Sequence, residues 1–223
     1  MKILRIEYLI RNGTFGASAE FKEVLGEIKD AIQAVTWPLG SDSFVINPVK
    51  QANGVKPIKN GCMEHLYSRG WRHEKRMKIT ANVEPGPVDA VKTVSGDREF
   101  VLEWETGNIS SSHRALNKVA VGLLEKIIVG GALIVPSRDM YKWLTDRVGN
   151  YREIEPYFPV WKNLQIEEGV LLVIEVEHDG TSDEVPIIAK GTDGRAKKPK
   201  KKKSKKRQVN QNVKKEKTKA SGD

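Results

Sequence analysis

The sequence predicts an α/β protein with a central mixed β-sheet flanked by helices. Strand-type and helix-type patterns of apolar residues alternate along the chain, two strand-type segments adjoin across a short turn, and the two kinds of element are intermixed rather than grouped. The composition changes near residue 195, after which lysine dominates and almost nothing apolar remains to be buried. We therefore expect one folded domain over residues 1–194 and a disordered basic tail over residues 195–223.

The first part of the domain contains one expected strand and two expected helices. Apolar residues alternate with mostly polar ones over residues 4–11, which predicts a half-buried strand. Apolar residues recur at three- and four-residue steps over residues 21–35, which predicts a helix with Ser18 as its cap. A second helix is expected over residues 57–70, followed by an irregular stretch over residues 71–87.

The remaining elements begin with a hairpin. Two β-branched or alternating segments, residues 88–94 and residues 100–105, follow one another across a Ser-Gly-Asp turn and predict two antiparallel strands. The later elements are a helix from near Ser112 to Ile128, a buried strand, a shorter helix, a break at Glu155-Pro156 and a last strand. The buried strand is expected over residues 132–135, the shorter helix over residues 140–148 and the last strand over residues 170–176.

Composition and charge exclude several classes of protein. Cys62 is the single cysteine, which excludes an intramolecular disulfide and fits a reducing, cytoplasmic compartment. No apolar run approaches the ~18 residues of a membrane span, so we expect a soluble protein. The chain carries +9, but its last 29 residues carry +12, which leaves −3 on the body. Such a body needs a local cleft and a cation to bind DNA.

The hairpin carries a candidate metal site. Strand alternation puts Glu103 and Glu105 on one face, away from the face built by Phe100, Leu102 and Trp104, and Asp89 on the preceding strand can lie beside them. Carboxylates held this close need a compensating cation, and Mg2+ takes oxygen ligands of this kind. The alternative is that the two glutamates simply face water on an amphipathic strand.

A segment dense in hydrogen-bond donors, residues 106–114, follows the glutamates and leads into a helix. Polar groups at a helix N-terminus suit anion contacts. Helix capping explains the serines of this segment, whereas Asn108 and Arg114 suggest readers of base edges beside a phosphodiester-cleaving site.

The segment LEWETGNISSSHRALNK, residues 102–118, closely resembles the active-site segment of the BamHI family of restriction endonucleases. The likeness extends over residues 36–59, 86–92, 141–158 and 187–194 and stops at the basic tail. The resemblance implies a homodimer that cuts both strands of a palindromic double-stranded DNA site, here GGATCC, with no nucleotide cofactor.

The resemblance also implies roles for individual residues. Asp89, Glu103, Glu74 and the Trp104 carbonyl would hold one or two Mg2+ ions. Glu105 replaces the lysine of the wider Asp/Glu-x-Lys pattern and would accept the proton of the attacking water or orient that water. The positions that match base-reading residues are Asn108, Ser110, Arg114, Asp146 and Arg147, and further candidates for DNA contact are Lys59, Asp193 and Gly194. Each of these positions also has a plainer interpretation. Asp146 and Arg147 could mark an exposed helix end, and Lys59 could be a solvated lysine. Asp193 and Gly194 could form a simple turn.

Three other functions compete with a sequence-specific nuclease. The chain could be a DNA-binding protein of the same fold without catalysis, a nucleic-acid-coating protein driven by its tail, or another nuclease such as a repair or junction-resolving enzyme. The lysines of the tail could tether DNA, which we favour, or act as a solubilising or targeting appendage. The apolar stripe over residues 116–128 is first of all core, and part of it could form a dimer interface.

Overall fold

A six-stranded mixed sheet forms the centre of the fold, as the sequence predicts. The computed structural model describes residues 1–75, 86–145 and 147–190, with the backbone alone for residues 74 and 75. The strand order is β1-β7-β6-β5-β4-β3, in which β5, β6 and β7 run parallel and the other neighbours antiparallel. The strands are β1 (Lys2–Asn12), β3 (Arg72–Lys75), β4 (Val88–Val94), β5 (Arg98–Trp104), β6 (Gly130–Pro136) and β7 (Gly169–Glu177). A small parallel pair, β2 (Val45–Ile46) and β8 (Gly180–Thr181), lies outside this sheet.

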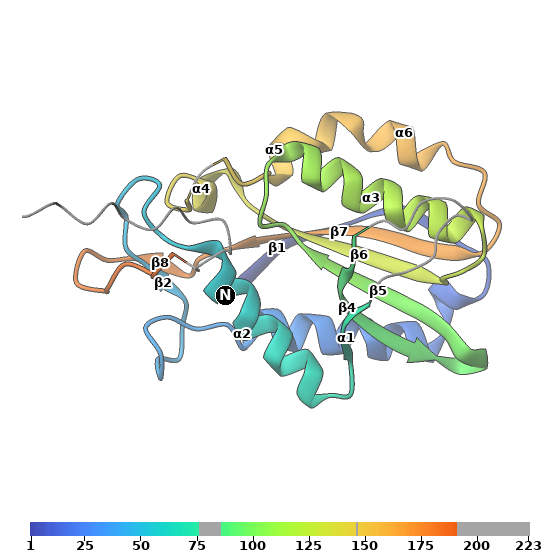
Figure 1. The fold of residues 1–223 in the computed structure, drawn as a ribbon, viewed down its shortest axis with the longest axis horizontal. Helices are drawn as coiled ribbons and strands as arrows, with labels where there is room; N and C mark the ends of the chain where they lie inside the picture. Colours follow the sequence, from blue (N-terminus) through green and yellow to red (C-terminus); the bar gives the residue numbers. More distant parts are fainter. Residues whose placement is uncertain (76–85, 146, 191–223) are drawn as a thin grey trace, which may run out of the picture. The chain divides into compact units, whose positions relative to one another are not determined.

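Helices cover both faces of the sheet (Figure 1). On one face lie α1 (Ala19–Gln33) and α2 (Val55–Ser68); on the other lie α3 (Ile109–Leu124), α5 (Tyr151–Ile154) and α6 (Phe158–Lys162). The Ser18 side chain caps α1 by accepting a hydrogen bond from the Phe21 N–H, as expected. The shorter elements are α4 (Arg138–Tyr141) and the 3₁₀ turns η1 (Phe15–Ala17), η2 (Ser95–Asp97) and η3 (Glu155–Tyr157).

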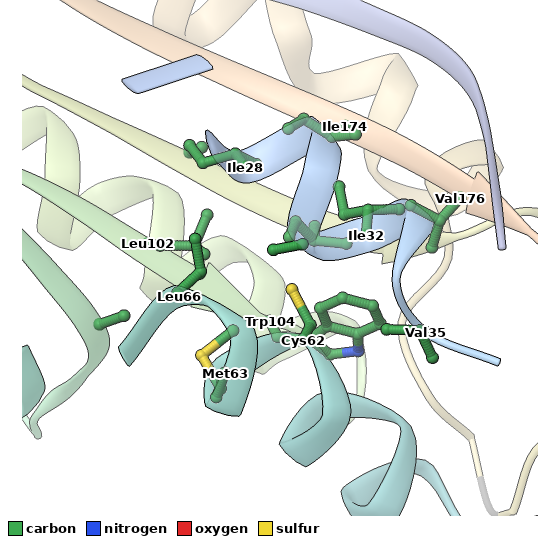
Figure 2. Packing of buried hydrophobic residues seen from close by; sticks show 14 of the residues in the cluster. Ile28, Ile32, Val35, Cys62, Met63, Leu66, Leu102, Trp104, Ile174 and Val176 are labelled. Carbon is green, nitrogen blue, oxygen red and sulfur yellow. The ribbon is translucent and has the colours of Figure 1, made fainter. Parts of the chain in front are cut away.

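The larger hydrophobic core lies between the sheet and the α1–α2 layer (Figure 2). Ile28 and Ile32 of α1 and Leu66 of α2 are fully buried, and they pack against side chains of β5 and β7 such as Leu102 and Ile174. A second core under α3 contains Val101, so successive residues of β5 serve opposite faces. This alternation is what turns Glu103 toward the α3 side of the sheet.

The structure differs from the sequence prediction at the segment that precedes β4. Residues 72–75, expected to be irregular, form the edge strand β3, because their backbone pairs with β4 from Arg72↔Val91 to Lys75↔Val88. Long-range backbone pairing of this kind leaves no clear local signal in four residues.

The expected helix over residues 140–148 is wrong. Among the described residues of this range, only those in α4 are helical, and the chain then leaves the helix because its backbone bonds to residues 51–53 instead. Lys142 O accepts from the Gln51 N–H, Trp143 O accepts from the Asn53 N–H, and the Thr145 N–H donates to Asn53 O at 2.7 Å. These distant partners satisfy the groups that a continuing helix would have used.

Candidate active site

A hollow of about 390 Å³ opens where β5 ends, between the start of β4 and the first turns of α3. Carboxylates, cations and backbone groups share its wall. The lining residues that matter here are Asp89, Glu103, Trp104, Glu105, Arg114 and Lys118. The three carboxylates predicted from the hairpin therefore do meet in one pocket.

Asp89 is held from two sides. Its Oδ2 accepts a hydrogen bond from the Trp104 N–H at 2.8 Å, which ties the start of β4 to the end of β5. Its Oδ1 lies 2.6 Å from Nζ of Lys59, which comes from α2. Lys59, a candidate phosphate contact, thus pairs with a candidate metal ligand in this structure, a pairing that no sequence spacing indicated.

Glu103 forms an ion pair within the protein. Its Oε1 lies 2.5 Å from Nζ of Lys118 on α3, and the two side chains are only 12% and 7% exposed. Burial raises the pKa of Glu103 to about 7, and the neighbouring Asp89 adds to this rise, whereas Lys118 opposes it. Near neutral pH a proton therefore competes with any cation for this carboxylate, and metal binding would release that proton.

Glu105 is more enclosed than Glu103. It is 4% exposed, its Oε1 accepts from the Gly107 N–H at 2.6 Å, and its Oε2 accepts from the Ser112 hydroxyl. Burial raises the pKa of Glu105, and the hydrogen bonds from Ser112 and Gly107 oppose that rise. Both oxygens therefore help to fold the loop that leads into α3, and the expected role of Glu105 toward water stays a prediction.

Glu74 lies on β3, which pairs with β4, the strand that carries Asp89. The pairs His73↔Ala90 and Lys75↔Val88 place its backbone across from Asp89. Its side chain lies outside the described part of the chain, so its expected role as a ligand stays a prediction.

The donors in the pocket fit a hard divalent cation. Asp89 and Glu103 offer carboxylate oxygens, and the Trp104 backbone lies beside Asp89. Mg2+ typically takes one or two carboxylates and completes its shell with water and phosphate oxygens. Among the residues whose side chains are described, no three His, Cys, Asp or Glu side chains form a ready metal cluster, so a full ligand set would need Glu74 or backbone and solvent oxygens.

The candidate base readers Asn108, Ser110 and Arg114 lie together and exposed at the N-terminal end of α3. Asn108 is the N-cap, because its Oδ1 accepts from the Ser110 N–H at 3.1 Å. Capping therefore explains Asn108, whereas the Ser112 hydroxyl donates to Glu105 and the Ser111 hydroxyl accepts from Arg114, contrary to the sequence interpretation. Arg114 donates to Ser111 Oγ at 3.3 Å within the helix, and the side chains of Asn108 and Arg114 are both exposed.

Arg147 lies on a turn rather than on a helix end, with φ of 53°. Two residues later, the Gly149 N–H donates to Gly107 O at 2.8 Å, which joins this turn to the loop before α3. The structure thus brings Arg147 and Asn108 to neighbouring segments. Asp146, Asp193 and Gly194, and the tail over residues 195–223, lie outside the described residues.

The architecture matches a known nuclease structure. The crystal structure of restriction endonuclease BglII complexed with a DNA 16-mer superposes with a TM-score of 0.54 at 11% identity, over 80% of this chain and 79% of that one. The fold is therefore that of a restriction endonuclease.

Sequence comparison identifies the family. The profile of the family described as Restriction endonuclease BamHI matches residues 1–195. The Type II restriction enzyme OkrAI of Oceanobacter kriegii is 57% identical over 196 residues, which are 88% of this chain and 99% of that enzyme. The Type II restriction enzyme BamHI of Bacillus amyloliquefaciens is 36% identical over 186 residues, which are 79% of this chain and 84% of that enzyme. The chain belongs to the BamHI restriction endonuclease family, whose members are type II site-specific deoxyribonucleases. No helix in the described residues is both long and apolar enough to cross a membrane.

Proposed function

We propose that this enzyme is a Mg2+-dependent homodimer that hydrolyses both strands of double-stranded DNA at GGATCC, acting in the cytoplasm. The observation that carries the proposal is the pocket in which Asp89, Glu103 and Glu105 meet beside the exposed donors of α3. A chain with a net charge of −3 over its body needs such a local site to bind a polyanion.

In the proposed mechanism, Asp89 and Glu103 would hold one or two Mg2+ ions, with the Trp104 carbonyl and Glu74 as further ligands. When bound, Mg2+ polarises phosphate oxygen and lowers the pKa of an attacking water. The protein keeps Asp89 in place through the Trp104 N–H. Glu105 accepts the water's proton or orients the water, and the buried Ser112 hydroxyl fixes its carboxylate.

Base reading is assigned to the two segments that the Gly149–Gly107 hydrogen bond joins. Arg114 and Arg147 can each donate two hydrogen bonds to O6 and N7 of guanine, Asp146 can accept from cytosine N4, and Asn108 can pair with adenine or guanine edges. Ser110 adds a hydroxyl beside them, and Asp193 and Gly194 are proposed to reach the minor groove. Lys59 is proposed to bind phosphate once it parts from Asp89. These side chains together favour a half-site that is rich in G·C base pairs.

A homodimer matches the two-fold symmetry of a palindromic site. Most of the apolar stripe over residues 116–128 is buried in the core beneath α3. Leu124 and Ile127 are the exceptions, with 48% and 38% of their surface exposed. These two residues are the part of the stripe that we assign to the subunit interface.

Incubation of the purified chain with a plasmid of known sequence tests the proposal, in Mg2+ and in EDTA. We expect discrete Mg2+-dependent cuts at GGATCC that disappear in Glu103→Ala and persist in the matched control Glu23→Ala, an exposed glutamate on α1. Cuts at another fixed palindrome would refute the base assignments alone. Binding without any cutting would refute the nuclease function in favour of a DNA-binding protein of the same fold.

A further inference from the structure

Lys118 is a buried cation that neither the motif nor the expected ligand set accounts for. Its side chain is 7% exposed, although lysine is almost never buried unless it is paired. Its Nζ donates to Glu103 Oε1 at 2.5 Å and to the Pro87 carbonyl at 3.2 Å. One ammonium group on α3 therefore holds the end of β5 and the residue just before β4.

The stability of the fold does not explain why Lys118 and Glu103 are buried as an ion pair. Replacing a buried ion pair by apolar residues of similar volume is often neutral or stabilising, because removing both charges from water is costly. A Lys–Glu pair buried in the wall of the candidate active-site pocket is therefore better explained by the chemistry of the pocket.

The two contacts of Lys118 bear directly on the proposed metal ligands. Pro87 lies two residues before Asp89, and Glu103 accepts the shorter of the two bonds. Lys118 thus sets the Glu103 carboxylate relative to the segment that carries Asp89. The Glu-Trp-Glu end of β5 itself supplies no cation, so the ammonium comes from α3.

We propose that Lys118 is the internal counter-ion and positioning residue of the cleavage site: it neutralises Glu103, competes with divalent cations for that carboxylate, and fixes it relative to the Asp89 segment. The inference rests on the proposed function, because it takes Asp89 and Glu103 as the metal ligands. It predicts opposite effects on metal binding and on cleavage when the charge is removed.

The test compares Lys118→Met with Lys118→Arg and with Lys92→Met. Lys92 is a matched control, because its Nζ also bridges a carboxylate and a carbonyl, Glu27 Oε1 at 3.0 Å and Arg69 O at 3.1 Å, outside the pocket. Mn2+ binding is measured by calorimetry without DNA, and single-turnover cleavage is measured at saturating Mg2+. Thermal unfolding is recorded for every variant.

For Lys118→Met we expect Mn2+ to bind about three- to tenfold more tightly at a pH well above the pKa of Glu103, where no proton occupies this carboxylate, because a competing positive charge is gone. We expect cleavage to slow by about 10- to 100-fold, the usual cost of losing a group that orients a metal ligand. Lys118→Arg should stay nearer to the wild type in both measurements, and Lys92→Met should change neither.

Unchanged or weaker Mn2+ binding in a folded Lys118→Met would overturn the proposal, as would cleavage as fast as that of Lys92→Met. If Lys118→Met does not fold, Lys118→Gln takes its place in the same comparison. If the wild-type chain cuts no DNA at all, the proposed function fails, while the Mn2+ titration still decides whether Lys118 competes for Glu103.

Discussion

Substitution of Gly149 by alanine tests whether the two proposed reading segments are held together as the structure shows. A Cβ on Gly149 would lie 2.4 Å from Ser112 Oγ and 3.3 Å from the Ile109 backbone. Ser112 has no room to yield, because it is fully buried and its hydroxyl donates to Glu105. The added methyl group must therefore push the turn of residues 147–149 away from the loop before α3.

The expected cost of Gly149→Ala follows from that clash. Overpacking a filled site typically costs about 1–3 kcal/mol, and about 2 kcal/mol lowers Tm by roughly 4–8 °C for a domain of this size. In a Ser112→Ala background the 2.4 Å contact is gone and only the milder one to Ile109 remains. The cost should then fall below about 1 kcal/mol, which gives a coupling of about 1–2 kcal/mol between the two positions.

Urea unfolding of the wild type, both single variants and the double variant measures this coupling. Gly26→Ala on α1 is the control, because its Cβ would meet nothing within 4 Å, and it should be neutral or slightly stabilising. The reasoning is refuted if Gly149→Ala costs the same with and without the Ser112 hydroxyl. If the reading segments are assigned correctly, Gly149→Ala should also lower the ratio of cleavage at GGATCC to cleavage at sites that differ by one base pair.

Three further predictions concern pH, the core and the tail. Burial raises the pKa of Glu103 in the folded chain to about 7 from 4.5, so between these pH values the folded chain keeps a proton that the unfolded chain has released. The free energy of unfolding should therefore fall as pH rises from 4.5 to 7. Glu103→Gln should flatten that fall in urea unfolding measured at about pH 5 and about pH 7.5. For the same reason Mn2+ affinity should rise with pH through about 7, and a pH-independent affinity would contradict Glu103 as a ligand. Asn53→Ala should cost about 3 kcal/mol or more, because the buried amide donates to Asn47 O and Trp143 O and accepts from the Ile188 N–H; a loss under about 1 kcal/mol in urea unfolding would count against this network. Removal of residues 195–223 should weaken sequence-independent DNA binding and reduce the slope of log affinity against log salt, while cleavage at the specific site persists; an unchanged slope would exclude the tail as a DNA tether.

Most of the sheet and its helices could be predicted from local patterns. The strand over residues 88–94 matches β4 to the residue, and Ser18 caps α1 as expected. Such elements are predictable because strand and helix periods, caps and turns are written in neighbouring residues. β3 and the end of the expected helix over residues 140–148 were missed, because their backbone partners lie far away in the sequence.

The sequence predicted which carboxylates of the hairpin lie near one another, but not how they are paired. Strand alternation correctly placed Glu103 and Glu105 on one side and Asp89 near them. Lys118 was missed although it ends the matched segment of residues 102–118, because its position on a helix does not tell which carboxylate it reaches. Likewise no spacing could show that Asn108 caps α3 or that Lys59 on α2 contacts Asp89 on β4.

Patterns along the chain are enough to predict the α/β class, the hairpin with its carboxylates and, through the resemblance, the BamHI family. Those features depend on local periodicity, on residue chemistry and on matched segments, all of which are readable along the chain. The folded structure was needed to show that Glu103 is paired and buried, that Glu105 is bound to its own loop, and that Gly149 joins the two proposed reading segments. Burial and pairing arise when segments far apart in sequence meet, and they set the charge, pKa and orientation of each group in the pocket.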